Sequence, residues 1–235
     1  MTTKHTIPVG NETVVAVHHH ADTEDWLVFC HGFQSDKSGS YESRCERAVS
    51  EGYNAVRFDF RGCGESSRSF GEQTLSSRIG DLEAVLEYFD PPSVTVFGSS
   101  FGGKVCFHVA GTNDGIEAVA TRAPVTYNRA FDNYRAESES LGTGGETRTN
   151  SGIGQKFFSD LDRHPFEAVV DRIEVPVCIF HGRDDESVAV EDSMEAVSEL
   201  GPDTMIQLCS GEGHRFSREA EERMRNQLFE WLNHY

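Results

Sequence analysis

The stretch Gly98-Ser99-Ser100-Phe101-Gly102 follows the apolar run Ser93-Val94-Thr95-Val96-Phe97 and precedes a helix-like segment at residues 104–110. This order of strand, sharp turn and helix is the context in which a G-x-S-x-G motif is informative. So tight a turn strains the serine backbone and projects its oxygen outward, and the flanking glycines avoid collisions with neighbouring strands and the following helix. Ser100 is therefore the candidate nucleophile. Ser99 is an alternative that lacks the two-residue glycine frame.

Outward from this motif, apolar runs alternate with helical patterns along the chain. Several runs are continuously apolar and rich in Val, Ile and Phe, which is typical of parallel strands covered on both faces. The first two are more polar and suit an antiparallel edge pair. The alternation predicts an α/β fold with a doubly wound, mostly parallel sheet of eight strands. We expect strands at 5–9, 13–18, 26–30, 55–60, 94–97, 117–121, 175–180 and 205–209, and helices at 41–50, 74–89, 104–110, 188–200 and 218–235.

Residues 125–165 interrupt this rhythm and include a polar, Gly-rich stretch at 138–145. A long, loop-rich insertion in a compact domain is usually functional or mobile. We therefore expect one domain over residues 1–235 that carries a small lid at about 125–165. The lid aromatics either contact substrate or only attach the lid to the body, and the lid arginines either bind an anionic substrate or are simply solvated. The candidate substrate-binding rings are Tyr127, Phe131, Tyr134 and Phe157, and the arginines are Arg129, Arg135 and Arg148.

The charge of the chain excludes some classes of partner. Asp and Glu total 39 against 21 Lys and Arg, which gives a net charge of −18. Such a field repels nucleic acid and anionic membrane surfaces, so we expect neither as a partner. Only four of the 21 bases are lysines, and this composition resembles that of proteins from salt-accumulating microbes. In molar salt, screening relieves the self-repulsion of a halophilic protein.

Cysteine usage and the apolar runs bear on compartment and cofactors. The six cysteines include no C-x-x-C pair, so we expect neither a disulfide framework nor a metal site. No run approaches the roughly 20 apolar residues that span a bilayer, and residues 1–10 lack the apolar core of a secretory signal. We expect a cytoplasmic protein without a cofactor. The sequence does not indicate its oligomeric state.

A serine hydroxyl is a weak nucleophile and needs a base, an orienting acid and donors for the oxyanion. Open α/β sheets place such groups where their strands end. The strand at 175–180 leads into His181-Gly182-Arg183-Asp184-Asp185-Glu186, and the strand at 205–209 leads into Ser210-Gly211-Glu212-Gly213-His214. The chain order is thus Ser100, then an acid, then His214.

With these elements the chain resembles an α/β-hydrolase fold serine hydrolase over nearly its whole length. The elbow after the fifth strand, the insertion after the sixth, the acid after the seventh and the histidine after the eighth all match that family. His31-Gly32-Phe33 resembles the family's oxyanion loop, and Asp59-Phe60-Arg61-Gly62-Cys63-Gly64-Glu65-Ser66 resembles its D-x-R-G-x-G-x-S segment. Compact carboxylesterases and serine aminopeptidase-like members are the most similar types.

The resemblance assigns roles residue by residue. Ser100 attacks an acyl carbonyl, His214 acts as base, and Asp185, four residues after His181, orients the histidine. The backbone N–H groups of Phe33 and Phe101 form the oxyanion hole. Asp184 is the neighbour that could replace Asp185, with Glu186 behind it. By contrast, His31 and His181 each close a strand and are expected to bond loop backbone.

The reaction implied is acyl transfer to water. We expect hydrolysis of carboxylic esters with small or medium acyl groups, so the partner is a small-molecule acyl substrate. Peptide, amide or thioester cleavage with the same three residues stays open, and a non-catalytic binding module of the same fold is the remote alternative.

Overall fold

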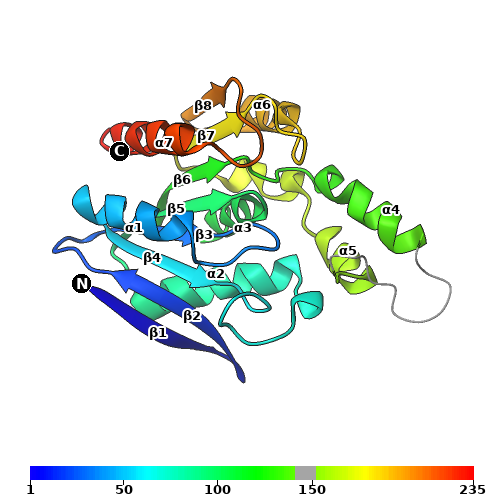
Figure 1. The fold of residues 1–235 in the computed structure, drawn as a ribbon, viewed down its shortest axis with the longest axis horizontal. Helices are drawn as coiled ribbons and strands as arrows, with labels where there is room; N and C mark the ends of the chain where they lie inside the picture. The colour runs from blue at the N-terminus through cyan, green and yellow to red at the C-terminus, as the bar shows by residue number, and fades with distance from the viewer. Residues whose placement is uncertain (141–151) are drawn as a thin grey trace.

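The computed structural model describes residues 1–140 and 152–235. Within these ranges eight strands form one sheet in the order β1-β2-β4-β3-β5-β6-β7-β8 (Figure 1). β1 pairs antiparallel with β2, β2 pairs antiparallel with β4, and every other neighbouring pair is parallel. The predicted mostly parallel sheet is confirmed. The strands are β1 (Thr2–Val9), β2 (Glu12–His19), β3 (Asp25–Cys30), β4 (Asn54–Asp59), β5 (Ser93–Ser99), β6 (Ile116–Arg122), β7 (Val177–Gly182) and β8 (Thr204–Cys209).

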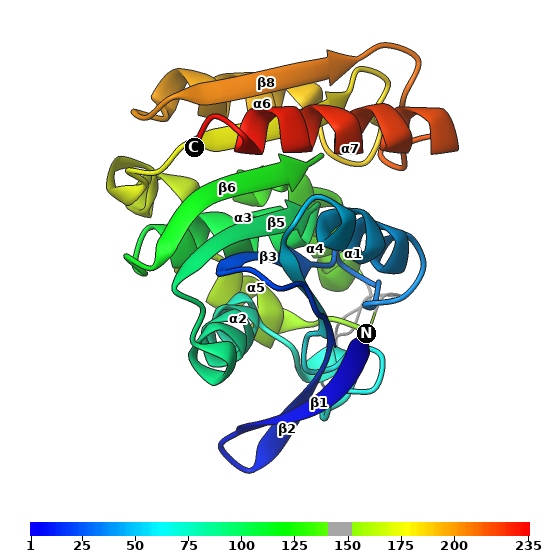
Figure 2. The ribbon, with the colours of Figure 1, turned by 90° about the vertical axis from the view of Figure 1, so that its left-hand side faces the viewer.

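Helices cover both faces of the sheet (Figure 2). α1 (Ser40–Ser50) and α7 (Arg218–Leu232) lie on one face, and α2 (Leu75–Phe89), α3 (Phe101–Ala110) and α6 (Val190–Glu199) lie on the other. Successive side chains of a strand point to opposite faces. In β3, Leu27 and Phe29 accordingly pack in the core beneath α1 and α7, and Val28 and Cys30 pack in the core beneath α2 and α3. Burial on both faces explains the continuously apolar runs in the sequence.

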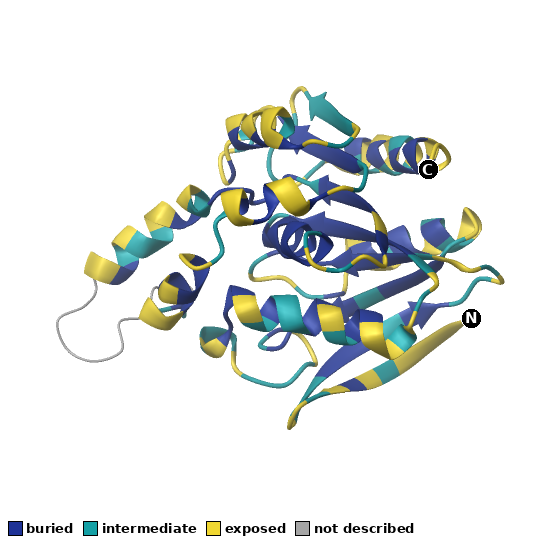
Figure 3. Ribbon diagram, turned by 180° about the vertical axis from the view of Figure 1, so that it is seen from behind, coloured by how far each residue is buried: buried dark blue, intermediate teal, exposed yellow. Residues whose placement is uncertain are grey.

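The segment that joins β6 to β7 is more helical than we predicted. It contains η2 (Asn128–Phe131), α4 (Asp132–Ser140), α5 (Gln155–Leu161), η3 (Phe166–Ala168) and η4 (Val170–Arg172). α4 and α5 extend beyond the body of the sheet, and most of α4 is exposed or half-buried (Figures 1 and 3). The expectation of a loop-rich insertion is therefore wrong for its described part, because α4 buries too few apolar residues to show a clear pattern. The Gly-rich run at 141–145 lies outside the described residues.

The parallel strands end at one edge of the sheet, and the loops that follow them meet there. β5 ends at Ser99, β7 at Gly182 and β8 at Cys209, so the loops that bear Ser100, Asp185 and His214 start from this edge. No helix within residues 1–140 and 152–235 is long and apolar enough to cross a membrane.

Candidate active site

Ser100 occupies a strained turn between β5 and α3. Its φ of 53° lies in the left-handed region that non-glycine residues rarely adopt. The turn is held by backbone hydrogen bonds: the Ser100 N–H donates to Arg122 O at 2.9 Å, and the Ser100 carbonyl accepts from Gly103 N and Val125 N, each at 2.9 Å. These bonds fix the conformation that presents the hydroxyl.

The motif glycines are required by close backbone contacts. A Cβ atom on Gly98 would lie 2.5 Å from the Gly102 carbonyl oxygen, and one on Gly102 would lie 2.3 Å from the Cys30 carbonyl oxygen. No side chain fits at either distance, so the tight elbow needs glycine at both positions.

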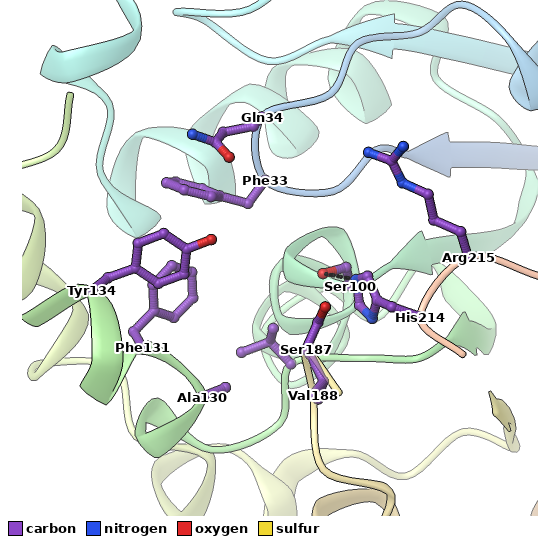
Figure 4. Close-up of a pocket in the computed structure, with 11 residues that line it drawn as sticks. Phe33, Gln34, Ser100, Ala130, Phe131, Tyr134, Ser187, Val188, His214 and Arg215 are labelled. Carbon is purple, nitrogen blue, oxygen red and sulfur yellow. Dashed lines mark hydrogen bonds between the residues drawn. The ribbon is translucent and has the colours of Figure 1, made fainter. Parts of the chain in front are cut away.

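His214 lies within hydrogen-bonding distance of Ser100. Its Nε2 is 3.0 Å from Ser100 Oγ, and its Nδ1 is 2.8 Å from Asp185 Oδ2 (Figure 4 draws the first pair). Because the Asp185 carboxylate is an acceptor, Nδ1 carries the proton and Nε2 is free to accept one from the serine. The structure thus brings together the three predicted residues. In the sequence, Asp185 lies 85 residues after Ser100, and His214 lies 29 residues after Asp185.

Asp185 is fully enclosed, with its side chain 0% exposed. All four of its hydrogen bonds come from donors: the Ser187 and Val188 N–H groups at 2.8 and 2.9 Å on Oδ1, and His181 and His214 at 3.1 and 2.8 Å on Oδ2. Burial by itself would raise the pKa of this carboxyl. The bonds from His181, His214 and Val188 outweigh burial and hold the pKa well below its ordinary value, so the group stays ionised.

The alternative residues stand elsewhere. Asp184 and Glu186 are exposed. The Ser99 side chain is buried on the α1 side of the elbow, where its hydroxyl accepts from Arg44 at 3.0 Å. His31 bonds loop backbone as expected, through Gly32 O at 2.9 Å and Phe60 N at 3.1 Å.

His181 bonds loop backbone at Val188, as predicted, but it also contacts two side chains. Its Nε2 lies 3.1 Å from both Asp185 Oδ2 and Val188 O, and its Nδ1 lies 2.7 Å from Ser193 Oγ. Since both partners of Nε2 are acceptors, Nε2 carries the proton and Ser193 donates to Nδ1. His181 therefore contacts Asp185 directly, which the spacing of the motif did not reveal.

The loop after β3 places Phe33 beside Ser100. A Cβ atom on Gly32 would lie 3.2 Å from Ser100 Cβ, so the backbone at Gly32 passes directly over the serine. The next N–H in the chain is that of Phe33, while the Phe101 N–H opens α3 and has no intrahelical partner. Both N–H groups predicted for the oxyanion hole thus belong to backbone next to Ser100.

Arg122, at the end of β6, joins the backbones of Ser100 and His214. Its carbonyl accepts from the Ser100 N–H, and its Nη1 donates to the His214 carbonyl at 2.6 Å. Glu221 of α7 lies 3.7 Å from Arg122 Nε and also receives two bonds from Arg44, at 3.2 and 2.6 Å. The loop that bears His214 is therefore anchored to the same strand as the elbow. We did not predict this residue, because the link depends on a side chain that spans 92 positions of sequence.

A cavity of about 450 Å³ opens above Ser100 and His214 (Figure 4). Phe33, Phe131 and Tyr134 form an aromatic wall on one side of the serine. The centroid of the Phe33 ring lies 5.3 Å from that of Phe131 and 5.7 Å from that of Tyr134. The rest of the lining comprises Gln34, Val125, Ala130, Ser187, Val188 and Arg215, none of which we predicted.

Two of the four rings predicted to bind substrate lie outside this lining. Phe157 is 1% exposed and packs under Phe131, 5.2 Å away, in the core. Tyr127 is 5% exposed and packs on Phe166 at 5.6 Å. Both predictions are corrected: the η2 and α5 helices turn these rings inward, so they attach the segment to the body.

The arginines of the β6–β7 segment are occupied by carboxylates. Arg129 pairs with Asp192 at 2.7 Å and with Glu195, and Arg135 pairs with Asp162 at 2.5 Å. Neither lines the cavity. Arg148 lies outside the described residues. The idea that Arg129 or Arg135 binds an anionic substrate is therefore not supported by the geometry.

Comparisons with known proteins agree with this architecture. The sequence profile of the alpha/beta hydrolase fold matches residues 25–142, half of the chain. The quorum-quenching protein AidA of Acinetobacter baumannii is 29% identical over 107 residues, which are 43% of this chain and 35% of AidA. The mitochondrial palmitoyl-protein thioesterase ABHD10 of Homo sapiens is 24% identical over 83% of this chain and 68% of its own length.

Solved structures show the same fold. Est1E from Butyrivibrio proteoclasticus, solved with ferulic acid bound, superimposes with a TM-score of 0.85 at 19% identity, over 98% of both chains. The profile match, the sheet order and the elbow agree: the chain belongs to the alpha/beta hydrolase fold family and is an enzyme of that family.

Proposed function

We propose that this chain is a serine hydrolase that cleaves carboxylic esters of small to medium acyl groups through a covalent acyl-enzyme. The observation that carries the proposal is the continuous hydrogen-bonded chain Ser100–His214–Asp185, with distances of 3.0 and 2.8 Å, at the floor of a cavity of about 450 Å³. A hydroxyl, a correctly protonated imidazole and an ionised carboxylate are the groups that acyl transfer requires.

The reaction proceeds in two halves. Ser100 Oγ forms a bond to the acyl carbon while His214 Nε2 takes the hydroxyl proton. The tetrahedral intermediate then breaks its bond to the leaving oxygen, which receives the proton from His214. A water molecule repeats the sequence on the acyl-enzyme, and the products are a carboxylic acid, an alcohol and the regenerated serine.

The oxyanion of each tetrahedral intermediate is assigned to the backbone N–H groups of Phe33 and Phe101. Donors of this kind contribute about 3 kcal/mol each to stabilising the transition state. Asp185 stabilises the imidazolium that forms on His214, and His181 and the two backbone N–H groups hold Asp185 in place.

The segment with η2, α4 and α5 is proposed to act as a lid for the acyl group. Phe131 and Tyr134 from this segment pack against Phe33 and form one aromatic wall of the cavity, which suits an apolar or aromatic acyl chain. The ferulic acid bound to Est1E is an aromatic acid of this kind, and supports the ester assignment by analogy. Thioester hydrolysis is the second candidate, since the relative that matches 83% of the chain is named a palmitoyl-protein thioesterase.

Two experiments test the proposal. A fluorophosphonate probe should label the wild-type protein and should not label Ser100→Ala, with both proteins showing the same thermal midpoint. Equal labelling of both would refute the nucleophile assignment, and no labelling of a folded wild-type protein would favour the binding-module alternative. A series of nitrophenyl esters, matched thioesters and aminoacyl amides then ranks the substrates, and amide turnover equal to ester turnover would refute the esterase assignment.

A further inference from the structure

The lining of the cavity has an unusual charge for this protein. The chain carries 39 acidic residues against 21 Lys and Arg. Among the described residues that line the cavity there is no Asp or Glu, and Arg215 is the only Lys or Arg. The lining of the cavity above Ser100 thus carries no carboxylate and one positive charge.

Arg215 also differs from Arg44, Arg122 and Arg129, three other arginines around the site. Arg44 and Arg122 engage Glu221, and Arg129 engages Asp192 and Glu195. None of the ion pairs between described residues involves Arg215, whose side chain is exposed at the cavity. Its guanidinium therefore remains available to an anion from solution.

The position of Arg215 indicates which part of a substrate it would meet. The leaving group must lie next to His214 Nε2, because that nitrogen returns the proton to it. Figure 4 shows Arg215 on the same side of Ser100 as His214, with Phe33, Phe131 and Tyr134 on the other side. The aromatic side thus faces the acyl group, and the arginine faces the leaving group.

We propose that Arg215 selects esters whose leaving group carries a carboxylate, that is, acyl esters of hydroxy acids. This inference rests on the proposed hydrolytic function and adds the charge of the leaving group to it. A guanidinium binds a carboxylate through two parallel N–H···O bonds, which gives orientation as well as attraction. Because the site is partly solvated, the expected preference over a neutral leaving group is about tenfold in kcat/KM.

A matched pair of substrates tests the inference: 4-acetoxybenzoate and 4-acetoxybenzamide. They share the acyl group and differ in the charge of the phenol that leaves. The measured quantity is the ratio of kcat/KM for the acid to that for the amide, in the wild type, Arg215→Gln and Arg215→Lys. Arg183→Gln is the control, since Arg183 is an exposed arginine on the β7 loop outside the cavity lining.

We expect the ratio to fall about tenfold in Arg215→Gln, mainly through a higher KM for the acid, to fall less in Arg215→Lys, and to stay at the wild-type value in Arg183→Gln. The amide substrate reports any general damage from a change next to His214, and the ratio cancels that damage. An unchanged ratio in Arg215→Gln, with both esters hydrolysed, overturns the inference and leaves the proposed function standing. If the wild type hydrolyses neither ester nor any member of the nitrophenyl series, the proposed function itself fails.

Discussion

Replacement of Asp185 by asparagine tests how the site works, because the structure predicts what the new amide must do. All four bonds to the carboxylate come from donors, but an asparagine offers only one acceptor oxygen. The backbone N–H groups of Ser187 and Val188 cannot change, so the amide oxygen must face them. The NH2 group then faces the two histidine rings.

His214 can accept from that NH2 group only by moving its proton from Nδ1 to Nε2. An Nε2–H cannot take the Ser100 proton, so the base is lost while the three side chains remain in place. In comparable sites this tautomer change costs about 10⁴-fold in kcat, which corresponds to about 5 kcal/mol of transition-state stabilisation. His181 keeps its Nε2 proton on Val188 O, so the fold around the loop should persist.

The assay is steady-state hydrolysis of a nitrophenyl ester by Asp185→Asn, with thermal unfolding to confirm that the variant is folded. Asp184→Asn is the matched control, and its exposed side chain predicts less than a twofold change. A folded Asp185→Asn that retains more than a tenth of wild-type kcat would refute the reasoning. A large loss in Asp184→Asn with none in Asp185→Asn would move the acid by one residue.

Four further predictions follow from other groups. Arg122→Met should lower kcat by roughly 10- to 100-fold with little change in KM, because the loop that bears His214 loses its hydrogen bond to Arg122. Arg122→Lys should recover part of the loss. An unchanged kcat in Arg122→Met would show that this hydrogen bond is dispensable. Burial, with Arg78 nearby, lowers the pKa of His31 to about 3. Between pH 6.5 and 3 the histidine is therefore protonated in the unfolded chain and neutral in the folded protein. Stability consequently falls as the pH drops, by about 1.4 kcal/mol per pH unit for this group. Urea unfolding from pH 7 to 5 should show a shallower slope in His31→Gln, and an identical slope would contradict the assignment. Burial lowers the pKa of Lys104 to about 7 despite the nearby Glu167. Between pH 7 and 10 the unfolded chain therefore binds a proton that the folded protein lacks, so stability should rise with pH, and Lys104→Met should lose this rise. The same rise in both proteins would place its cause elsewhere. Finally, the net charge of −18 predicts a thermal midpoint that increases with KCl concentration, whereas a midpoint insensitive to salt would argue against salt adaptation.

Much of the fold and the core of the site could be predicted because both depend on local patterns. Apolar runs locate the strands, and parallel strands must end at a common edge, so the sequence alone predicts that Ser100 and His214 lie close together. The choice of Asp185 over Asp184 came from the motif spacing and agrees with the geometry, in which only Asp185 turns inward.

What could not be predicted depends on the direction of side chains across distant segments. Tyr127 and Tyr134 stand seven residues apart in one segment, yet one packs inward and the other lines the cavity, and only the turn at η2 decides between them. The contacts of Arg122 with the His214 carbonyl and of His181 with Asp185 leave no periodic signal. Nothing in the sequence around Arg215 indicates that its side chain lines the cavity.

Arg122 is hydrogen-bonded to the backbones of both Ser100 and His214, which limits how far these two residues can move apart. Its backbone carbonyl binds the Ser100 N–H, and its side chain binds the His214 carbonyl. When the sheet flexes, Ser100 and His214 move together with Arg122. The distance between these two residues should therefore vary less than the distance from either of them to α4. Alterations in the lengths of the surrounding loops should then change which molecules are admitted while the reacting atoms keep their spacing, which would let this scaffold acquire new substrates without rebuilding its chemistry.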